Sequence, residues 1–468
     1  MEQKNTRSNF SNSVGFIMAA AGSAVGLGNI WRFPYLAAKD GGGVFILCYI
    51  ILALTFGFAL LTTEVAIGRK TAQSPLTAYG KLHKNWGFLG TLACLVPTLI
   101  LPYYCSIGGW VFKYLFSFVT GKGFASAEDG YFTGFISETG QPVIWMLLFF
   151  AATAFVVYSG VNKGIEKYNR ILMPVLVVLV VGIAFFSLTL THTDEQGVTR
   201  TGMQGLAVYL IPDFTGMTLS KFLSVIMDAM GQMFFSISVA MGIMVAYGSY
   251  ATKDTDLMRS INRIEIFDTV VALLAGMMII PAVFTFAGTE GMSAGPGLMF
   301  VSLPKIFAAM GGAGHVIGSA FFLMTAFAAV TSAVSVMEAI TSSLMDAFHV
   351  SRRRAATFVA AYAVAGGIIV CLGYNLLYFE AALPNGNVGQ ILDILDYLSN
   401  NCIMPLIALL TCILIGWVVS PQTVIDEVTL GGHRFSRRKL YVVMIKFAAP
   451  VLLFVLLLQS VGIFEMLS

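Results

Sequence analysis

Charge is scarce in this chain. Only 11% of its 468 residues are Asp, Glu, Lys or Arg, whereas a water-soluble protein carries about 25%. Hydrophobic residues make up 57%, and the formal net charge is only +3. A chain of this composition cannot hide its apolar surface in water, so we expect an integral membrane protein. The small net charge excludes the strongly basic surface typical of nucleic-acid binding, so we expect no nucleic-acid partner.

Two other features are missing. The first 18 residues contain no short apolar core followed by a small-residue cleavage site, so we expect no cleaved signal peptide. No pair of cysteines with a regular spacing lies in a polar loop. We therefore expect free core thiols and not disulfides or metal ligands. The six cysteines are Cys48, Cys94, Cys105, Cys371, Cys402 and Cys412.

Long apolar stretches are what the sequence does contain. A membrane-spanning helix needs about 20 apolar residues, and strands of about 10 alternating residues, the signature of a membrane barrel, are not present. The sequence predicts an all-α transmembrane protein, with residues 1–468 as one membrane domain. We count eleven stretches, at about 13–37, 43–69, 87–119, 141–159, 166–190, 221–250, 260–287, 315–347, 354–375, 389–419 and 439–463.

The loops indicate an orientation. Cytoplasmic loops of membrane proteins are enriched in Lys and Arg. If the N-terminus is cytoplasmic, alternate loops hold 19 of the 27 basic residues, including Arg352, Arg353 and Arg354. The opposite loops hold few, such as Lys122 and Arg200. We therefore predict a multi-pass protein of the cell membrane with a cytoplasmic N-terminus and an extracellular C-terminus.

Two of the eleven stretches have polar interiors. They read "AAAGSAVGLGNIWRFPY" from Ala19 and "GQMFFSISVAMG" from Gly231. Paired interruptions five helices apart indicate an inverted repeat with a binding site at the breaks. In a broken helix the freed carbonyls suit a cation, and the amides of the next half-helix suit a carboxylate. A glycine-rich packing face is the alternative, but Asn29 and Arg32 in the same stretch favour a water-lined site.

At "GSAVGLGNIWRFPY" the chain resembles the neurotransmitter:sodium symporter family, in its bacterial, eleven-helix form that carries hydrophobic amino acids. The resemblance continues through "LPYYCSIGGW", "GVNKGIEKYNRILMP", "FFSISVAMG" and "VTSAVSVMEA" over nearly the whole chain. It implies the leucine-transporter-like fold, with discontinuous helices 1 and 6. Two inverted five-helix repeats would occupy about 10–190 and 220–420, and an extra helix about 439–463.

The resemblance also implies two sodium sites. Apart from the family, the hydroxyls of Thr331 and Ser332 could simply bond to the preceding helical turn. The first site would use Ala24, Asn29, Ser236 and Asp268, together with the substrate carboxylate. The second site would use Gly22, Val25, Ala328, Thr331 and Ser332.

The family's substrate pocket maps onto four predicted helices. Tyr104 would donate its hydroxyl to the substrate carboxylate, and Phe235 would form an outer lid. An aromatic pair facing a helix bundle is, by itself, more often plain core. The implied pocket residues are Ser23, Ala24, Leu27, Gly28, Ile100, Tyr104, Phe234, Phe235, Ser236, Ser238, Met241, Ser332 and Val336.

Gates carry over as well. Arg32 and Asp396 would pair on the extracellular side, and Arg7 and Asp346 on the cytoplasmic side, with Ser249, Tyr250 and Phe10 in support. We assign Glu64 to holding the unwound backbone of the first segment and give Glu338 no role.

Gly26 and Asp268 carry the implied specificity. Amine-transporting members have an Asp at the position of Gly26, so the substrate here is expected to bring its own carboxylate. Asp268 occupies either the position of a sodium-ligating Asn or the place, one turn on, where chloride-independent members carry an acid. In both cases a fixed charge near Tyr49, Gln232 and Ser236 would replace a bound chloride.

We therefore predict a sodium-coupled, chloride-independent symporter of hydrophobic L-amino acids that works by alternating access, and not an enzyme. A substrate-binding sensor and a proton-coupled amino-acid permease of the same fold are the alternatives. An ion channel ranks below both, because the sequence shows one asymmetric site and no repeated filter. The sequence indicates neither the exact substrate nor the sodium stoichiometry, proton counter-transport or oligomeric state.

Overall fold

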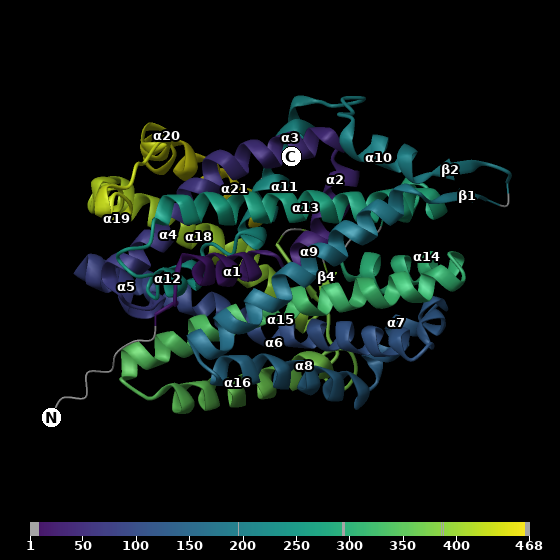
Figure 1. The fold of residues 1–468 in the computed structure, drawn as a ribbon, viewed down its shortest axis with the longest axis horizontal. Helices are drawn as coiled ribbons and strands as arrows, with labels where there is room; N and C mark the ends of the chain where they lie inside the picture. Colours follow the sequence, from purple (N-terminus) through teal and green to yellow (C-terminus); the bar gives the residue numbers. More distant parts are fainter. Residues whose placement is uncertain (1–8, 195, 293–294, 385, 387, 464–468) are drawn as a thin grey trace.

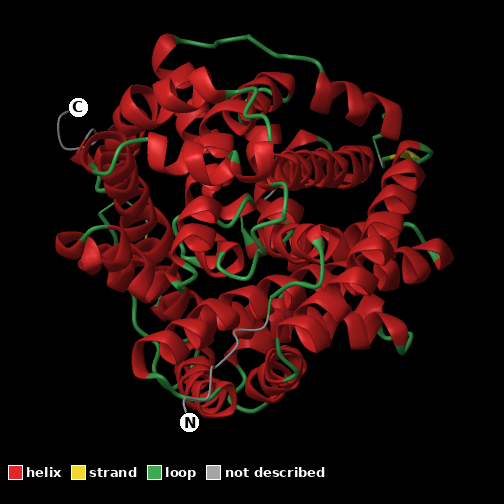
Figure 2. Ribbon diagram, turned by 60° about the vertical axis from the view of Figure 1, so that its left-hand side comes forward, coloured by secondary structure: helices red, strands yellow, loops and turns green. Residues whose placement is uncertain are grey.

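The computed structural model describes residues 9–194, 196–292, 295–384, 386 and 388–463. Helices make up most of this part of the chain (Figures 1 and 2). Strands occur in two small antiparallel hairpins, which pair β1 (Thr191–Thr193) with β2 (Thr199–Thr201) and β3 (Ala381–Ala382) with β4 (Val388–Gly389). The expectation of an all-α transmembrane architecture is therefore confirmed.

The helices run through the chain in two series. The first series is α1 (Ser13–Ala24), α2 (Phe33–Lys39), α3 (Gly43–Leu52), α4 (Phe58–Thr71), α5 (Pro75–Leu82), α6 (Gly87–Val119), α7 (Tyr131–Ser137), α8 (Gln141–Tyr158), α9 (Lys167–Leu188) and α10 (Gly202–Leu210). The second series is α11 (Leu219–Ser236), α12 (Ile243–Gly248), α13 (Leu257–Ala287), α14 (Leu303–Ala309), α15 (Gly312–Phe348), α16 (Arg352–Leu372), α17 (Ile391–Asp396), α18 (Met404–Ile413), α19 (Gln422–Val428), α20 (Arg438–Val443) and α21 (Ala449–Ser460).

The expected apolar stretches correspond to these helices. In the described residues, nine helices are long and apolar enough to span a membrane, and the bent pair of α1 with Gly28–Lys39 makes ten. The remaining expected stretch, 221–250, is α11 and α12, separated by a break at 237–242. Several spans combine two α-helices through a wider π-helical turn, such as Ala53–Gly57 between α3 and α4.

The first break lies at Val25 and Gly26. Helix α1 begins at an N-cap, where the Asn12 side chain accepts a hydrogen bond from Gly15 N, and it ends where Val25 becomes extended (φ −78°, ψ 96°). The chain then turns by 53° into the second half of the span. Gly28 lies after the break and begins the π-helical stretch Gly28–Arg32. Its missing side chain admits Phe235, whose Cδ1 would lie 2.1 Å from an added Cβ.

The second break is conformationally more demanding. Ser238, Ala240 and Gly242 have φ values of 53°, 60° and 73°. Left-handed backbone is uncommon for residues with a side chain and costs of order 1–3 kcal/mol each, so it persists only where surrounding structure enforces it. The two breaks face each other, because Ser238 Oγ donates to Ser23 O at 3.0 Å. Helix α1 lies inside the bundle, where it contacts α9, α13 and α15 (Figure 1).

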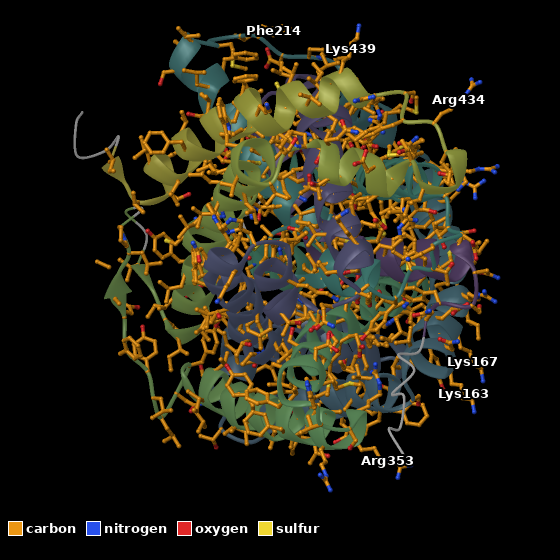
Figure 3. The ribbon with its side chains drawn as sticks, turned by 90° about the vertical axis from the view of Figure 1, so that its left-hand side faces the viewer. Lys163, Lys167, Phe214, Arg353, Arg434 and Lys439 are labelled. Carbon is orange, nitrogen blue, oxygen red and sulfur yellow. The ribbon has the colours of Figure 1, made fainter. Side chains whose placement is uncertain are left out.

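Basic side chains surround the end of the bundle that lies on the left of Figure 1, beside α5 and α19. Figure 3 faces this end and shows Lys163, Lys167, Arg353, Arg434 and Lys439 pointing outward. All five belong to the loops that we predict to be cytoplasmic. This distribution agrees with the orientation expected from the sequence, which remains a prediction.

Arg437, the residue just before α20, joins the extra helix to the rest of the bundle. Its guanidinium bonds to both carboxylate oxygens of Glu265 on α13, at 3.1 and 2.6 Å. It also donates to Asn262 Oδ1 and to the Leu54 carbonyl, and lies 3.5 Å from the centre of the Phe58 ring. The Glu265 side chain is only 4% exposed, so its charge depends on this partner.

We expect Arg437→Leu to lower the thermal stability of the purified protein, because it leaves the Glu265 carboxylate buried and unpaired. The loss should be about 3 kcal/mol, the lower end for a broken buried pair. The double variant Arg437→Leu with Glu265→Leu should recover part of that loss. The matched control is Arg438→Leu, because among the described residues this exposed side chain bonds to the exposed Gln422 and to no buried acid. An equal fall in melting temperature for Arg437→Leu and the control would contradict this role.

Candidate functional site

Four helical segments bring polar side chains together beside the first break. Asn29 Nδ2 donates to Ser236 Oγ at 3.0 Å and to Asp268 Oδ1 at 2.8 Å. The Ser236 hydroxyl lies 2.8 Å from Asp268 Oδ2, and the Tyr49 hydroxyl lies 2.9 Å from Ser236 Oγ. All four side chains are fully buried. Three residues predicted for the first sodium site, Asn29, Ser236 and Asp268, are therefore in direct contact.

Asp268 lies between the residues predicted to bind the first sodium and the residues predicted for the chloride region. One of its oxygens meets the amide of Asn29, and the other lies 3.3 Å from the Tyr49 hydroxyl. Gln232 is close by, because its Nε2 donates to the Gly28 carbonyl at 3.1 Å. The carboxylate thus contacts a predicted sodium ligand and two residues of the predicted chloride region at the same time. Which of the two family positions Asp268 occupies stays a prediction.

The second predicted sodium site is only partly assembled. Ser332 Oγ donates to the Ser23 carbonyl at 3.1 Å and lies 3.5 Å from the Val25 carbonyl, so it faces the break in α1. Thr331 Oγ1 instead lies 3.0 Å from Phe327 O and 3.1 Å from Ala328 O, both in its own helix. The back-bonded alternative therefore describes Thr331 in this structure but not Ser332. In the described residues, no group of three His, Cys, Asp or Glu side chains could hold a metal ion.

A small cavity lies between the two breaks and helices α6 and α15. Its volume is about 30 Å³, so an amino acid would enter only with some movement of the lining side chains. Eight predicted pocket residues line it, and Gly26 and Ile243 join them. The eight are Ser23, Ile100, Tyr104, Phe235, Ser238, Met241, Ser332 and Val336.

The other predicted pocket residues lie around this cavity. Leu27 lines the larger cavity described below, and Phe234 lines a side cavity next to it. Ala24, Gly28 and Ser236 line none of these three cavities, although Ser236 belongs to the buried polar cluster.

Tyr104 is the most informative residue of the pocket. Its side chain is buried, and its hydroxyl makes no hydrogen bond of normal geometry in the described part of the chain, although the Ser332 hydroxyl and the Leu27 backbone lie near it. A Cβ added at Gly26 would lie 3.3 Å from this hydroxyl and 2.7 Å from Ser332 Oγ. The hydroxyl therefore points to the exposed backbone of the α1 break, where a ligand carboxylate could accept its proton.

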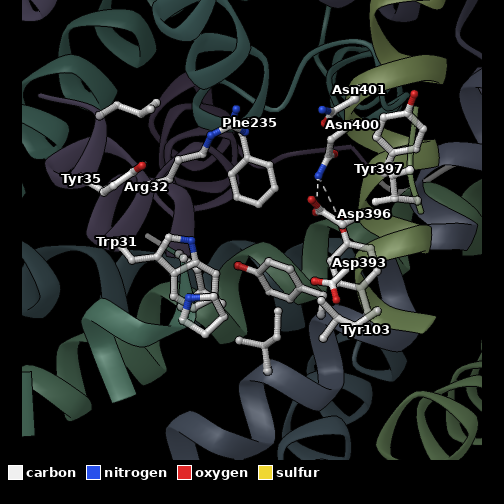
Figure 4. Close-up of a pocket in the computed structure, with 18 of the residues that line it drawn as sticks. Trp31, Arg32, Tyr35, Tyr103, Phe235, Asp393, Asp396, Tyr397, Asn400 and Asn401 are labelled. Atoms are coloured by element: carbon white, nitrogen blue, oxygen red, sulfur yellow. Dashed lines mark hydrogen bonds between the residues drawn. The ribbon is translucent and has the colours of Figure 1, made fainter. Parts of the chain in front are cut away.

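A wider cavity of about 580 Å³ lies outside Phe235 (Figure 4). Tyr104 and Phe235 line both cavities, so the two rings separate them. Arg32 and Asp396, the residues predicted for the extracellular gate, line the wide cavity together. No ion pair within 4 Å joins them in the described structure, and Asp396 accepts from Asn400 Nδ2 at 2.6 Å instead.

Charged groups also lie at the edge of the wide cavity. Lys39 Nζ is 2.7 Å from Asp228 and 3.9 Å from Asp40. Burial raises the pKa of Asp40 to about 7, and the neighbouring charge of Asp228 adds to the rise. By these distances Lys39 is bonded mainly to Asp228.

The opposite end of the site is closed by aromatic packing. The Phe10 ring contacts Tyr247 and Tyr250, and Phe10 N donates to the Tyr250 carbonyl at 3.1 Å. Asp346 accepts from Ser74 N at 2.6 Å, and Ser249 Oγ donates to Ala246 O within its own turn. Arg7, the predicted partner of Asp346, lies outside the described residues.

Two buried acids behave differently from expectation. Glu64 Oε1 accepts from Ala240 N at 2.6 Å, and its second oxygen has no partner among the described residues. It therefore holds the break between α11 and α12, and our assignment to the first segment was wrong. Glu338, to which we gave no role, pairs with Arg352 at 2.6 Å and accepts from the Tyr250 hydroxyl. The sequence spacing of these partners offers no signal that would have revealed either contact.

Comparisons with known proteins agree with this arrangement. The family model of the sodium:neurotransmitter symporter family matches residues 7–133 and 131–468. An uncharacterized sodium-dependent transporter of Bacillus subtilis, YhdH, is 32% identical over 99% of both chains. The human sodium- and chloride-dependent GABA transporter 2 is 25% identical over 90% of this chain and 75% of its own.

A solved structure is similar over almost its whole length. The crystal structure of MhsT in complex with L-phenylalanine superimposes with a TM-score of 0.85 at 35% identity. The match covers 97% of this chain and all of that one. Together with the family match, the broken helices and the buried polar cluster between them, this result identifies the chain as a sodium-dependent membrane transporter that belongs to the sodium:neurotransmitter symporter family.

Proposed function

We propose that this transporter imports hydrophobic L-amino acids together with sodium, without a need for chloride. The observation that carries this proposal is the pocket in which the unpartnered Tyr104 hydroxyl faces the α1 break, while the rest of the lining is largely apolar. In this arrangement Tyr104 and the backbone amides after the break bind the substrate carboxylate. Ile100, Met241 and Val336 then contact its side chain.

The space at Gly26 indicates why the proposed substrate is an amino acid with its own carboxylate. A residue with a side chain at position 26 would project against Ser332 and Tyr104, whereas Gly26 leaves that space to the ligand. Among the described residues, no side-chain carboxylate lines the small cavity. The substrate therefore adds its own carboxylate to that of Asp268 beside the first sodium, and binding of substrate and sodium becomes mutually dependent. MhsT, which is similar over nearly the whole chain, binds L-phenylalanine.

In the proposed transport cycle, one sodium is held by the Ala24 carbonyl, Asn29, Ser236 and Asp268. A second is held by Ser332 with the carbonyls of the α1 break, and by Thr331 after its hydroxyl turns from its own helix. With the predicted orientation, the wide cavity opens to the outside and the Phe10 contacts close the cytoplasmic side. A pocket that binds without transport would instead make the protein a sensor, and proton coupling would make it a permease.

The first test concerns sodium. We expect Ser332→Ala to reduce sodium-driven uptake into proteoliposomes at least tenfold, because it removes the hydroxyl that faces the break. Thr331→Val should weaken uptake less, and the double variant should abolish it. Thr325→Val is a matched control, since Thr325 bonds to its own helix at Phe321. Wild-type uptake by the double variant would contradict a second sodium site, and uptake driven by a proton gradient alone would favour the permease.

The second test concerns the substrate. Unlabelled Leu, Phe and Trp should each displace a labelled hydrophobic amino acid in a competition assay, because Met241 adapts to side chains of different shape. Lys and Glu should not compete, since the described lining residues offer no charged partner for their side chains, and dopamine should not compete because it lacks a carboxylate. Competition by dopamine but not by Trp would contradict the proposal. Saturable sodium-dependent binding with no uptake would identify the sensor.

The third test concerns chloride. Replacing external chloride by gluconate should leave uptake unchanged, because the Asp268 carboxylate already supplies a fixed negative charge. Two unit charges about 4 Å apart interact by about 4 kcal/mol at an effective dielectric constant of about 20. Asp268→Ser should make uptake chloride-dependent or abolish it. A large loss of wild-type uptake in gluconate would mean that Asp268 does not have this role.

A further inference from the structure

Arg32 has no hydrogen bond or ion pair with any described residue, although charged groups surround it. It lines two adjoining cavities, the wide one that contains Asp396 and a side cavity of about 350 Å³. The side cavity is bounded by α11, by Asn400 and Asn401, and by Gln459 and Ser460 of the extra helix. The arginine therefore has room on two sides.

In the structure, Arg32 lies on the side of the wide cavity that faces α11. Figure 4 shows its guanidinium beside Phe235, across the cavity from Asp396. A Cβ added at Gly231 would lie 3.2 Å from Arg32 Nη2, and it would approach no other non-neighbouring atom within 4 Å. The bare backbone of Gly231 thus forms the surface on which the guanidinium lies.

While Arg32 lies beside Gly231, Asp396 is hydrogen-bonded to Asn400 instead. Asn400 Nδ2 donates to Asp396 Oδ1 at 2.6 Å and lies 3.3 Å from the Tyr103 hydroxyl. Asn400 is one helical turn after Asp396, so its amide reaches the carboxylate without any movement of the backbone. Two other acids line the wide cavity: Asp228 is paired with Lys39 at 2.7 Å, and Asp393 accepts from Gln390 N at 3.0 Å.

We propose that Gly231 and Asn400 are positioning residues that hold the Arg32–Asp396 gate open. Gly231 gives Arg32 a resting place away from Asp396, and Asn400 satisfies Asp396 in the meantime. Closure exchanges these partners, as Arg32 leaves the glycine and displaces the amide from the carboxylate. The free-energy difference between the two arrangements then depends on two residues that contact neither substrate nor sodium. This inference rests on the gate of the proposed transport function.

The test is the accessibility of a single cysteine in the wide cavity. Ile107→Cys on α6 places a thiol in its lining, and the rate of its reaction with a charged methanethiosulfonate reagent is measured with sodium and without substrate. Protein without the reporter gives the background from native cysteines. We expect Gly231→Ala to slow the reaction about fivefold, the lower end of usual coupling between linked sites. The added methyl group moves Arg32 towards Asp396.

Asn400→Leu should act in the same direction, since Asp396 then loses the Asn400 amide and keeps only the Tyr103 hydroxyl beside it until Arg32 arrives. The matched control is Gly182→Ala, because a Cβ at Gly182 meets no atom within 4 Å. In an Asp396→Asn background, Gly231→Ala and Asn400→Leu should both lose their effect, since the carboxylate that Arg32 meets on closure is then absent.

Unchanged reaction rates for Gly231→Ala and Asn400→Leu would overturn the proposal. The same slowing in the Asp396→Asn background would overturn it too, since it would reflect a general change of packing. The assay needs no transport. If the protein takes up no amino acid but the variants change cysteine accessibility as expected, the proposed substrate is refuted and the gate inference stands.

Discussion

The need to satisfy backbone hydrogen bonds in a hydrocarbon environment governs this structure. Lipid offers neither donors nor acceptors, so an interrupted helix is stable only where its free carbonyls and amides face protein groups, water or a ligand. Both breaks meet this need through each other and through buried side chains. Ser238 and Ser332 donate to carbonyls at the end of α1, and Glu64 accepts from Ala240 in the second break. The places where regular structure fails are therefore also where ligands can bind.

The arrangement around the breaks separates rigid from adjustable parts. Asn29, Ser236, Tyr49 and Asp268 form a closed, fully buried network in which each side chain has at least one partner. Arg32 lies in open cavities without such a partner. A transporter needs both kinds of environment, because an ion site must keep its geometry while the access route to it changes.

Much of this could be predicted from the sequence because the membrane limits the choices. The apolar stretches correspond to the observed helices, and glycines and polar residues inside two of them indicated the breaks. The contact of Asn29 with Ser236 and Asp268 could be predicted only through the family resemblance, since these residues are far apart in the chain. The partners of Glu64 and Arg437 could not be predicted, because the side chain that meets a buried charge depends on packing between distant helices. Likewise, no sequence pattern distinguishes Ser332, which faces the break, from Thr331, which bonds to its own helix.

The unpartnered hydroxyl of Tyr104 has a consequence for the empty transporter. A buried polar group without a hydrogen bond costs about 1–3 kcal/mol. A ligand with a well-placed acceptor removes this penalty, whereas a ligand of the same shape without one keeps it and adds its own desolvation. Sites built in this way discriminate more strongly against a missing polar group than against a missing methylene. With the substrate that we propose, the pocket is therefore expected to be permissive towards the size of a side chain and strict towards the functional group at the other end of the molecule.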